Sequence, residues 1–393
     1  MFNKSVFSVF FAIYLGLSPI YWLPYVAPIF FIAIKNFLFV YVVLCGIYFS
    51  IKNNSPFEIK IPGGYPVFLL LIFMFFLVLP NFLLGNNNGN LSALINFLQT
   101  ILFLIASRFI IYYKKVLFVI KFSLLVLSIF VTLSILFMIT MPSIPNPYNQ
   151  DLTLLETAFG GARTGWTPSI GLFIPFILMI SKSYILIFIY LFSQMLTGGR
   201  AGFYLSILMV PILVVIERSW GMKLKFISLI IILILGIYIY NPFYFDDFRV
   251  FSSLSNSDNS DEFSSGRLSL ISDAWFSIMN SPILGNAMNS SFLGYNVHNV
   301  FLKGWVYYGF IYFMCSVIIV LYIFLIWLRR YRKLESYNDK KFFIILLCVL
   351  LFGVGIGMVE PSIIFGNFTT FSIWWFAFAL VASDQFLTSN NRI

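Results

Sequence analysis

Charged and titratable side chains are scarce in this chain. Asp, Glu, Lys and Arg together make up 10% of its 393 residues, and it contains a single histidine, His298. Soluble domains carry roughly 25% charged residues, so the composition excludes an ordinary water-soluble globular protein. The sequence also has no HExxH, no Walker A loop and no GxSxG, which are signatures of three large enzyme classes. Any chemistry must therefore come from a few isolated polar residues.

Cysteine is rare as well. Cys45, Cys315 and Cys348 each lie within an apolar run, and no CxxC spacing occurs. Free cysteine is among the most buried residue types, so we interpret all three as apolar filler and predict no disulfide framework. The acidic stretch 258–262 lacks the ligand spacing of a calcium-binding loop and is interpreted as a solvated loop. We therefore expect no metal and no cofactor.

Apolar sequence, in contrast, is abundant. The chain is 61% hydrophobic and 20% aromatic, with a mean hydropathy of +0.96. Inside a bilayer every backbone amide must be satisfied within the protein, which permits helices or a closed barrel. Barrel strands alternate apolar and polar residues, and runs such as 68–79 do not alternate. The sequence therefore predicts helices that cross a membrane.

The hydrophobic runs predict an all-α polytopic membrane protein in which residues 1–393 form one integral membrane domain. About 20 apolar residues are needed for each crossing, and we expect about twelve spans. The N-terminal run is interpreted as a retained first helix, because no clear cleavage site follows it. The short span from Ser169 has an alternative, in which 169–197 form one kinked or re-entrant unit. The spans are expected to begin near Val6, Ile29, Tyr65, Ala93, Val116, Ser169, Ser183, Ala201, Phe226, Asn299, Phe342 and Thr369.

Basic residues indicate the orientation of these spans. With the N-terminus inside, most of the 24 Lys and Arg residues fall in inner loops or at inner helix ends, and we place Lys35 among them. This asymmetry satisfies the positive-inside rule. The net charge of +10 is therefore a topology signal, and we expect no nucleic-acid partner. The outer side takes five exceptions: Arg163, Arg200, Arg249, Arg267 and Lys303.

Two long outer loops are predicted, at 142–168 and at 242–298, the second between the ninth and tenth spans. Within the second loop, apolar residues recur at helical spacing and predict an amphipathic helix near 267–280. Ser265 is a candidate cap for its start, and Pro282 follows its end. A helix of this kind is typical of segments that lie flat on the membrane surface.

Three of the outer arginines stand where a helix is expected to begin or a glycine-rich turn occurs. Arg267 follows Gly266, Arg200 lies within Thr197-Gly198-Gly199-Arg200-Ala201-Gly202, and Arg163 lies within a similar glycine-rich run. A helix N-terminus and a guanidinium together favour an anion, above all a phosphate. The alternatives are a solvated arginine at a helix start, a snorkelling anchor at Arg200 and an ordinary turn at Arg163.

His298 is the candidate general base. Neutral imidazole can accept a proton from a hydroxyl group near physiological pH. The alternative is an inert interfacial residue beside Asn299, which is a candidate helix cap. Glu360, at the outer end of the eleventh span, can orient a base or an arginine, or it can be a plain helix-end acid. Trp275 can belong to the interfacial aromatic belt.

Taken in chain order, these elements resemble the O-antigen ligase and polymerase superfamily of bacterial inner-membrane glycosyltransferases. The resemblance covers residues 160–315, and each motif alone is weak. The chain departs from the family in having Gly199 where a serine is common. The matching residues are Arg163-Thr164-Gly165 with Pro168, Thr197 to Gly202, Ser265-Gly266-Arg267, Ala274-Trp275, Ser281-Pro282-Ile283-Leu284-Gly285, His298-Asn299 with Leu302, and Gly309.

The resemblance implies a metal-independent, multi-pass enzyme of the cell inner membrane whose active site faces the periplasm beneath a large periplasmic loop. Its donor would be an oligosaccharide on undecaprenyl diphosphate, transferred with inversion and without a nucleotide sugar. Arg200 and Arg267 would bind the diphosphate, with Arg163 as a third contact, and His298 would be catalytic. Asn299, Glu360 and Trp275 would support them. Partners implied are membrane lipid and a chain-length regulator protein.

Three functions remain open at this point. A polymerase of O-antigen or a related surface polysaccharide, acting in lipopolysaccharide biosynthesis, is favoured because such chains diverge widely and are often this rich in Phe, Tyr and Ile. A ligase would instead pass the glycan to lipid A-core. A non-enzymatic lipid-glycan flippase or transporter is the third, but transporters usually carry ionisable residues at mid-membrane, whereas the charges here fall mainly at helix ends.

Overall fold

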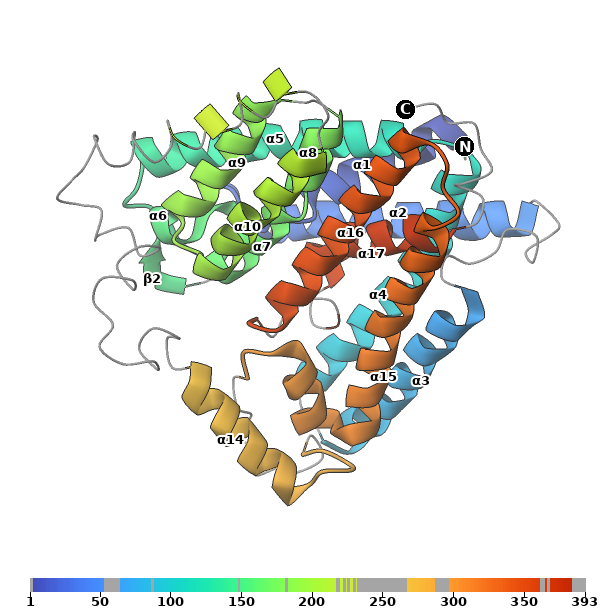
Figure 1. Ribbon diagram of the computed structural model, residues 1–393. Helices are drawn as coiled ribbons and strands as arrows, with labels where there is room; N and C mark the ends of the chain where they lie inside the picture. Colours follow the sequence, from blue (N-terminus) through green and yellow to red (C-terminus); the bar gives the residue numbers. More distant parts are fainter. Residues whose placement is uncertain are drawn as a thin grey trace. The chain divides into compact units, whose positions relative to one another are not determined.

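The computed structural model describes residues 3–52, 64–85, 88–147, 149–180, 183–216, 267–286, 297–360 and 368–383, with single positions between them at 220–221, 224, 227–228, 231 and 365. Figure 1 shows a chain built almost wholly of helices. Contacts divide it into two compact units. Unit 1 comprises Met1–Phe11, Phe39–Leu117 and Ser264–Ile393, and unit 2 comprises Ala12–Leu38 and Phe118–Phe263.

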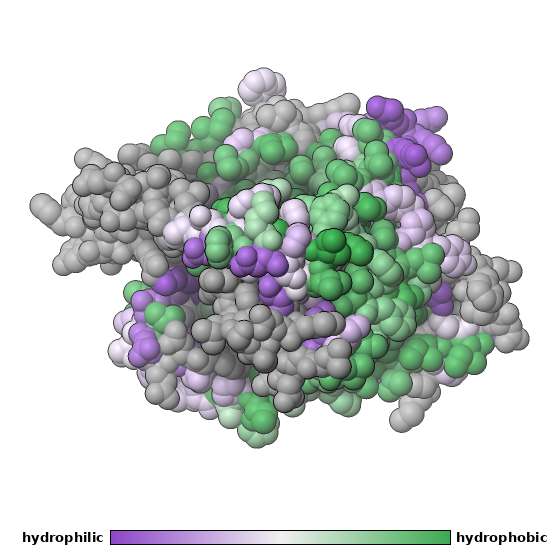
Figure 2. All heavy atoms as spheres, turned by 90° about the horizontal axis from the view of Figure 1, so that it is seen from below, coloured by the Kyte–Doolittle hydropathy of each residue, from purple (hydrophilic) through white to green (hydrophobic). Residues whose placement is uncertain are grey.

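Six helices of the described residues are long and apolar enough to cross a membrane, and four shorter helices are apolar too. Large apolar side chains on these helices are exposed, and Figure 2 shows that they cover broad parts of one face. The fold is therefore that of an all-α, multi-pass membrane protein; a total of twelve spans stays a prediction. The long helices are α2 (Pro28–Lys52), α3 (Gly64–Gly85), α4 (Asn88–Tyr112), α5 (Val116–Thr140), α15 (Val300–Tyr331) and α16 (Tyr337–Gly357), and the shorter ones are α1 (Lys4–Leu17), α9 (Tyr184–Leu196), α10 (Arg200–Ile216) and α17 (Phe368–Ala382).

The core of unit 1 is built around α17. This helix packs against α4, α15 and α16, and its residues from 371 to 382 are buried. A helix that is apolar on every side must be surrounded by other helices. The Trp374 indole fills the space beside Gly353 and donates a hydrogen bond to the Leu350 carbonyl at 3.1 Å. These contacts fix α17 against α16. Glu360, a candidate site residue, follows the C-terminal end of α16.

Unit 2 contains a run of short elements after α5. An antiparallel pair of strands, β1 (Pro145–Asn146) and β2 (Asn149–Thr153), leads into a helical turn. Much of the segment predicted as an outer loop at 142–168 thus has regular structure. The following elements are α6 (Leu154–Thr157), the 3-10 helix η1 (Ala158–Gly160), α7 (Arg163–Gly171) and α8 (Ile174–Ile180).

The predicted span from Ser169 differs from the structure. Its residues form the end of α7 and all of α8, helices of 9 and 7 residues, each shorter than a crossing requires. Pro168 lies inside α7 and removes one of its backbone hydrogen bonds, because proline has no amide hydrogen. Most of the span predicted from Phe226 lies outside the described residues.

Lys35, which was counted among the residues of inner loops and inner helix ends, lies inside α2 and not at its end. Its side chain is buried, donates to the Ser18 carbonyl at 3.3 Å and lies over the Tyr21 ring. Ser18 directly follows the C-terminal end of α1, whereas Lys52 marks the opposite end of α2. Lys35 therefore satisfies a carbonyl at the end of α1.

Helix α14 (Arg267–Asn280) is fixed to α15 through the segment that follows it. Gly309 has a left-handed φ of 85°, which breaks α15 into two helical parts. At that break the Pro282 carbonyl accepts hydrogen bonds from the Phe310 amide at 3.0 Å and the Trp305 indole at 2.9 Å. A side chain on Gly309 would collide with the Ile283 carbonyl, so glycine is required for this close approach.

Candidate functional site

His298 lies at the junction of three helices of unit 1. The preceding residue, Val297, is fully buried in a small apolar cluster with Ala274 and Ile278 of α14 and Val306 of α15. His298 itself is 25% exposed. The backbone entering the histidine is therefore anchored by packing between α14 and α15.

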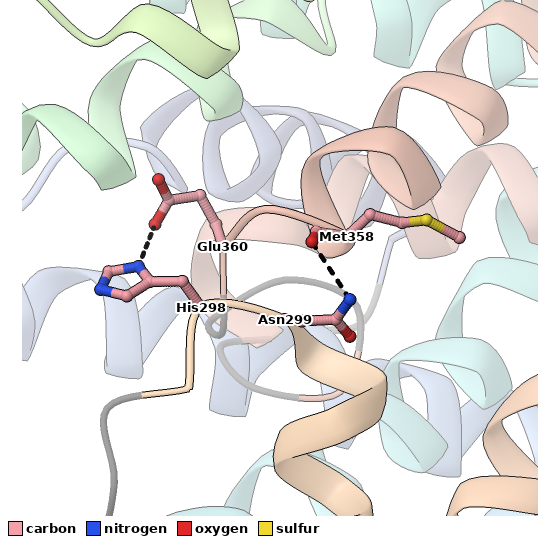
Figure 3. A network of polar contacts seen from close by, with 4 residues as sticks. All are labelled: His298, Asn299, Met358 and Glu360. Carbon is pink, nitrogen blue, oxygen red and sulfur yellow. Dashed lines mark hydrogen bonds and ion pairs between the residues drawn. The ribbon is translucent and has the colours of Figure 1, made fainter. Parts of the chain in front are cut away.

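Asn299, the next residue, anchors the backbone leaving the histidine. Its Oδ1 accepts hydrogen bonds from the amides of Phe301 and Leu302, both at 3.0 Å, which caps the start of α15. Its Nδ2 donates to the Met358 carbonyl at 3.1 Å, just beyond the end of α16. One side chain therefore joins the start of α15 to the end of α16 (Figure 3).

This junction places Glu360 beside the imidazole. The Glu360 side chain is 4% exposed, and its Oε2 lies 3.6 Å from Nδ1 of His298. The Glu360 amide donates to the Ile356 carbonyl at 2.8 Å, so the carboxylate is held by the last turn of α16. Figure 3 shows the two side chains pointing toward each other, with the second ring nitrogen directed away from the carboxylate.

The geometry favours a particular use of the imidazole. Nδ1 is buried and faces the carboxylate, so the exposed part of the ring lies elsewhere. A carboxylate beside Nδ1 favours the tautomer that carries its proton there and leaves Nε2 to accept one. The separation of 3.6 Å is an ion-pair distance once the ring is protonated and is longer than a direct hydrogen bond. The pair can thus stabilise the imidazolium that forms when Nε2 takes up a proton.

Two helices of unit 2 begin with the predicted phosphate-binding arginines. Arg163 is the first residue of α7 and Arg200 the first of α10. The residue before each is Ala162 or Gly199, neither of which has a side-chain acceptor for the first helical amides. By contrast, Ser183 caps α9 through its side chain. The starts of α7 and α10 carry the positive ends of the helix dipoles, which favour an anion.

The starts of α7 and α10 are held together by small residues. Thr167 lies so close to Gly199 and Gly202 that a Cβ added at Gly199 would be 2.2 Å from its hydroxyl oxygen. The side-chain amide (Nε2) of Gln194, on α9, donates to the Thr167 carbonyl at 2.7 Å and to the Ser206 hydroxyl of α10 at 3.0 Å. Thr167 thus occupies the space that a side chain at Gly199 would need, which accounts for glycine at this position.

Two further predicted site residues, Arg267 and Trp275, lie on α14. Arg267 is the first residue of α14, whose stretch Arg267–Asn280 begins and ends where the spacing had predicted a helix. Trp275 is 50% exposed on α14 and packs edge-on against Trp305 at 6.0 Å. Arg249 and Ser265 lie outside the described residues.

Sequence reasoning missed two contributors to these sites. The partner of Asn299 is a backbone carbonyl, that of Met358, and backbone partners leave no pattern in a sequence. No feature of the sequence pointed to Thr167 either. Its spacing of four residues from Arg163 places it one turn further along the same helix. Among the described residues, no group of three or more His, Cys, Asp or Glu side chains is arranged to hold a metal ion.

Comparison with known proteins adds no assignment to this geometry. No protein-family model matches the chain, and no curated protein matches it.

Proposed function

We propose that this chain is a glycosyltransferase of the bacterial inner membrane that polymerises oligosaccharide repeat units of O-antigen or a related surface polysaccharide. The donor is an oligosaccharide linked to undecaprenyl diphosphate, and the acceptor is a sugar hydroxyl on a second lipid-linked glycan. The proposal rests on the motif resemblance within residues 160–315 and on the chemistry that the described side chains can perform.

One observation carries the proposal: the buried Glu360 carboxylate lies 3.6 Å from Nδ1 of the chain's single histidine. A carboxylate removed from water is costly unless it has a partner. The packing of helices against lipid does not require such a pair, whereas removal of the proton from an acceptor hydroxyl requires a base. In the proposed step, Nε2 of His298 takes the hydroxyl proton while the oxygen attacks the anomeric carbon.

The proposed role of the arginines is to bind the leaving group, undecaprenyl diphosphate. As the new glycosidic bond forms, the bond between the anomeric carbon and the phosphate oxygen breaks, and undecaprenyl diphosphate departs with the electron pair. Negative charge therefore grows on the diphosphate during the reaction. Arg163 and Arg200, each the first residue of a helix, can stabilise that charge with their guanidinium groups, and Arg267 has the same place at the start of α14.

The test is extension of a lipid-linked repeat by the purified protein in detergent or nanodiscs. Growth of the glycan with release of undecaprenyl diphosphate is expected for the wild type, and its loss is expected for His298→Ala at normal membrane insertion. Extension by the wild type would exclude transport as the sole activity. Retained extension in His298→Ala would remove the histidine from the mechanism.

Polymerase and ligase differ in the lipopolysaccharide that remains after deletion. Cells that lack a polymerase retain single repeat units on lipid A-core, whereas cells that lack a ligase attach none. Electrophoresis of lipopolysaccharide from a deletion strain, with and without the wild-type chain, is therefore expected to show one repeat unit per molecule in its absence. Complete loss of attached glycan would favour the ligase.

A further inference from the structure

Helix α14 has two exposed flanks of opposite character. Its buried face carries Ala274, Ser277 and Ile278. One flank carries Ile271, Trp275 and Met279, which are 41%, 50% and 58% exposed and follow one another at intervals of four residues. Residues at that spacing lie above one another on the same side of a helix. The opposite flank carries Ser269, Asp273 and Asn280, all exposed. Phe276, which is 69% exposed, lies between the two flanks, three residues from both Asp273 and Met279.

The apolar flank continues directly into the surface of a membrane-spanning helix. The Trp275 ring meets the Trp305 ring edge-on at 6.0 Å. The Trp305 ring in turn stacks on Phe313 at 4.7 Å and contacts Phe310 at 5.3 Å. Phe310, which is 43% exposed, lies within α15, a helix long and apolar enough to span the bilayer. An unbroken apolar strip thus runs from α14 onto α15.

Several contacts hold α14 rigidly in this position. The Trp305 indole donates to the Pro282 carbonyl, and the Asn286 side chain donates both to the Ser277 carbonyl of α14 at 3.1 Å and to the Val306 carbonyl of α15 at 3.2 Å. Between these anchors, Ile283 and Leu284 are 64% and 74% exposed. They add two large apolar side chains to the same segment.

We propose that α14 lies in the interfacial region of the bilayer, with the Ile271, Trp275 and Met279 flank among lipid acyl chains and the Asp273 flank in water. At 14 residues α14 is too short to cross the hydrocarbon. Bilayer lipid is the occupant because the strip is continuous with the lipid-exposed surface of α15. Tryptophan is also enriched at the membrane interface, and a helix with one apolar and one polar flank fits that environment. The inference does not depend on the proposed glycosyl transfer.

The experiment compares spin labels on the two flanks of the full-length protein in phospholipid vesicles. Met279→Cys and Asp273→Cys are exposed positions on the same helix, and each is labelled in a background where the three buried native cysteines are replaced by alanine. Collision rates with oxygen, which concentrates in lipid, and with a water-soluble nickel chelate report the surroundings. The label at 279 is expected to favour oxygen at least severalfold over the label at 273.

Two outcomes would overturn the inference. Equal access of the nickel chelate to both labels would place the whole of α14 in water. Low access of both reagents at position 279 would show that a second copy or another protein covers the flank. If the cysteine-free background fails to fold, the wild-type chain is irradiated in vesicles that contain a photoreactive phospholipid. Crosslinks within residues 271–284 support the inference, and crosslinks restricted to the spanning helices contradict it.

Discussion

The residue with the greatest chemical consequence is Glu360, because it gives the single histidine a defined orientation. A bare interfacial imidazole would be free to rotate between rotamers. Here Nδ1 faces a buried carboxylate at 3.6 Å, while Val297 and Asn299 fix the backbone on either side. Within the proposed function His298 is therefore the catalytic residue and Glu360 a positioning residue that acts through it.

Substitution at His298 and Glu360 is expected to separate these two roles. His298→Ala should lower kcat by about 10²–10⁴-fold, the usual contribution of a positioned base. Glu360→Gln should lower it less, because the amide can still contact the ring but no longer stabilises the imidazolium that forms when Nε2 takes up the proton. The extension rates of the two variants measure both effects.

Asp339→Asn is the matched control for Glu360→Gln, since Asp339 lies at the opposite end of α16. It removes a carboxylate from the first turn of α16 without touching the histidine, and it should leave the extension rate unchanged. A Glu360→Gln enzyme with a normal extension rate would assign the carboxylate a purely structural role.

Arg200 offers a test of phosphate binding in which the charge is preserved. Lysine keeps the positive charge but cannot form the bidentate contact of a guanidinium. Charge-assisted hydrogen bonds contribute about 1.5–3 kcal/mol, so Arg200→Lys should lower kcat/KM by roughly 10–100-fold. Arg329→Lys, at an exposed position in the last turn of α15, should have no effect. Full activity of Arg200→Lys in the extension assay would make Arg200 a membrane anchor only.

The contact between Gly199 and Thr167 predicts compensation between two substitutions. Gly199→Ser should lower thermal stability and activity, because its Cβ would lie 2.2 Å from the Thr167 hydroxyl oxygen and 2.4 Å from its methyl group. Thr167→Ala removes both atoms, so the double variant should recover part of each loss. Gly165→Ala is the control, since its Cβ would meet only the Gly160 carbonyl oxygen at 3.5 Å. Strictly additive losses in a double-mutant cycle would contradict the contact.

Among the secondary-structure elements, the start of α15 links the site to the fold. Asn299→Ala should destabilise the protein by about 0.5–2 kcal/mol, the usual cost of losing an N-cap. Asn299→Asp should restore the cap, because a carboxylate accepts from the same amides, but it cannot donate to the Met358 carbonyl. We therefore expect Asn299→Asp to recover thermal stability while extension stays low.

Ser183→Ala provides the comparison for this prediction. Ser183 caps α9 by accepting from the Leu186 amide at 3.3 Å, so its loss should lower stability without a selective effect on rate. If Asn299→Asp recovers the rate as fully as the stability, the link between α15 and α16 is not needed for activity.

Most helices were predictable from sequence because apolar runs of sufficient length have few alternatives in a membrane. The runs that became α2, α5, α15 and α16 are examples. The exceptions have local physical causes. The run from Ser169 was predicted as a short span, with a kinked or re-entrant unit over 169–197 as the alternative, and helix breaks divide it between α7 and α8. Lys35 was grouped with inner helix ends, whereas its burial against the Ser18 carbonyl is a tertiary contact.

At the scale of the whole molecule, the candidate site residues were visible in the sequence but their pairing was not. His298 and Asn299 drew attention as a rare imidazole beside a capping residue. Nothing in the sequence connected them with Glu360 or with the Met358 carbonyl, which follow about 60 residues later in the chain. Such contacts arise from the packing of α16 against α15 and are set by tertiary structure rather than by local pattern.

The orientation of the whole protein in the membrane is the last expectation, and every assignment of an outer face depends on it. The positive-inside rule places the loop between α15 and α16 inside, since Arg329 and Arg330 end α15 and Arg332 and Lys333 lie in the loop. Ser143, before β1, falls on the outer side. Both Ser143 and Glu335 are exposed, and the native cysteines are buried. A membrane-impermeant maleimide applied to spheroplasts should therefore label Ser143→Cys directly and Glu335→Cys only after permeabilisation. The reverse pattern would place the arginine-bearing starts of α7 and α10 and His298 on the cytoplasmic face, where a periplasmic polymerase could not use them.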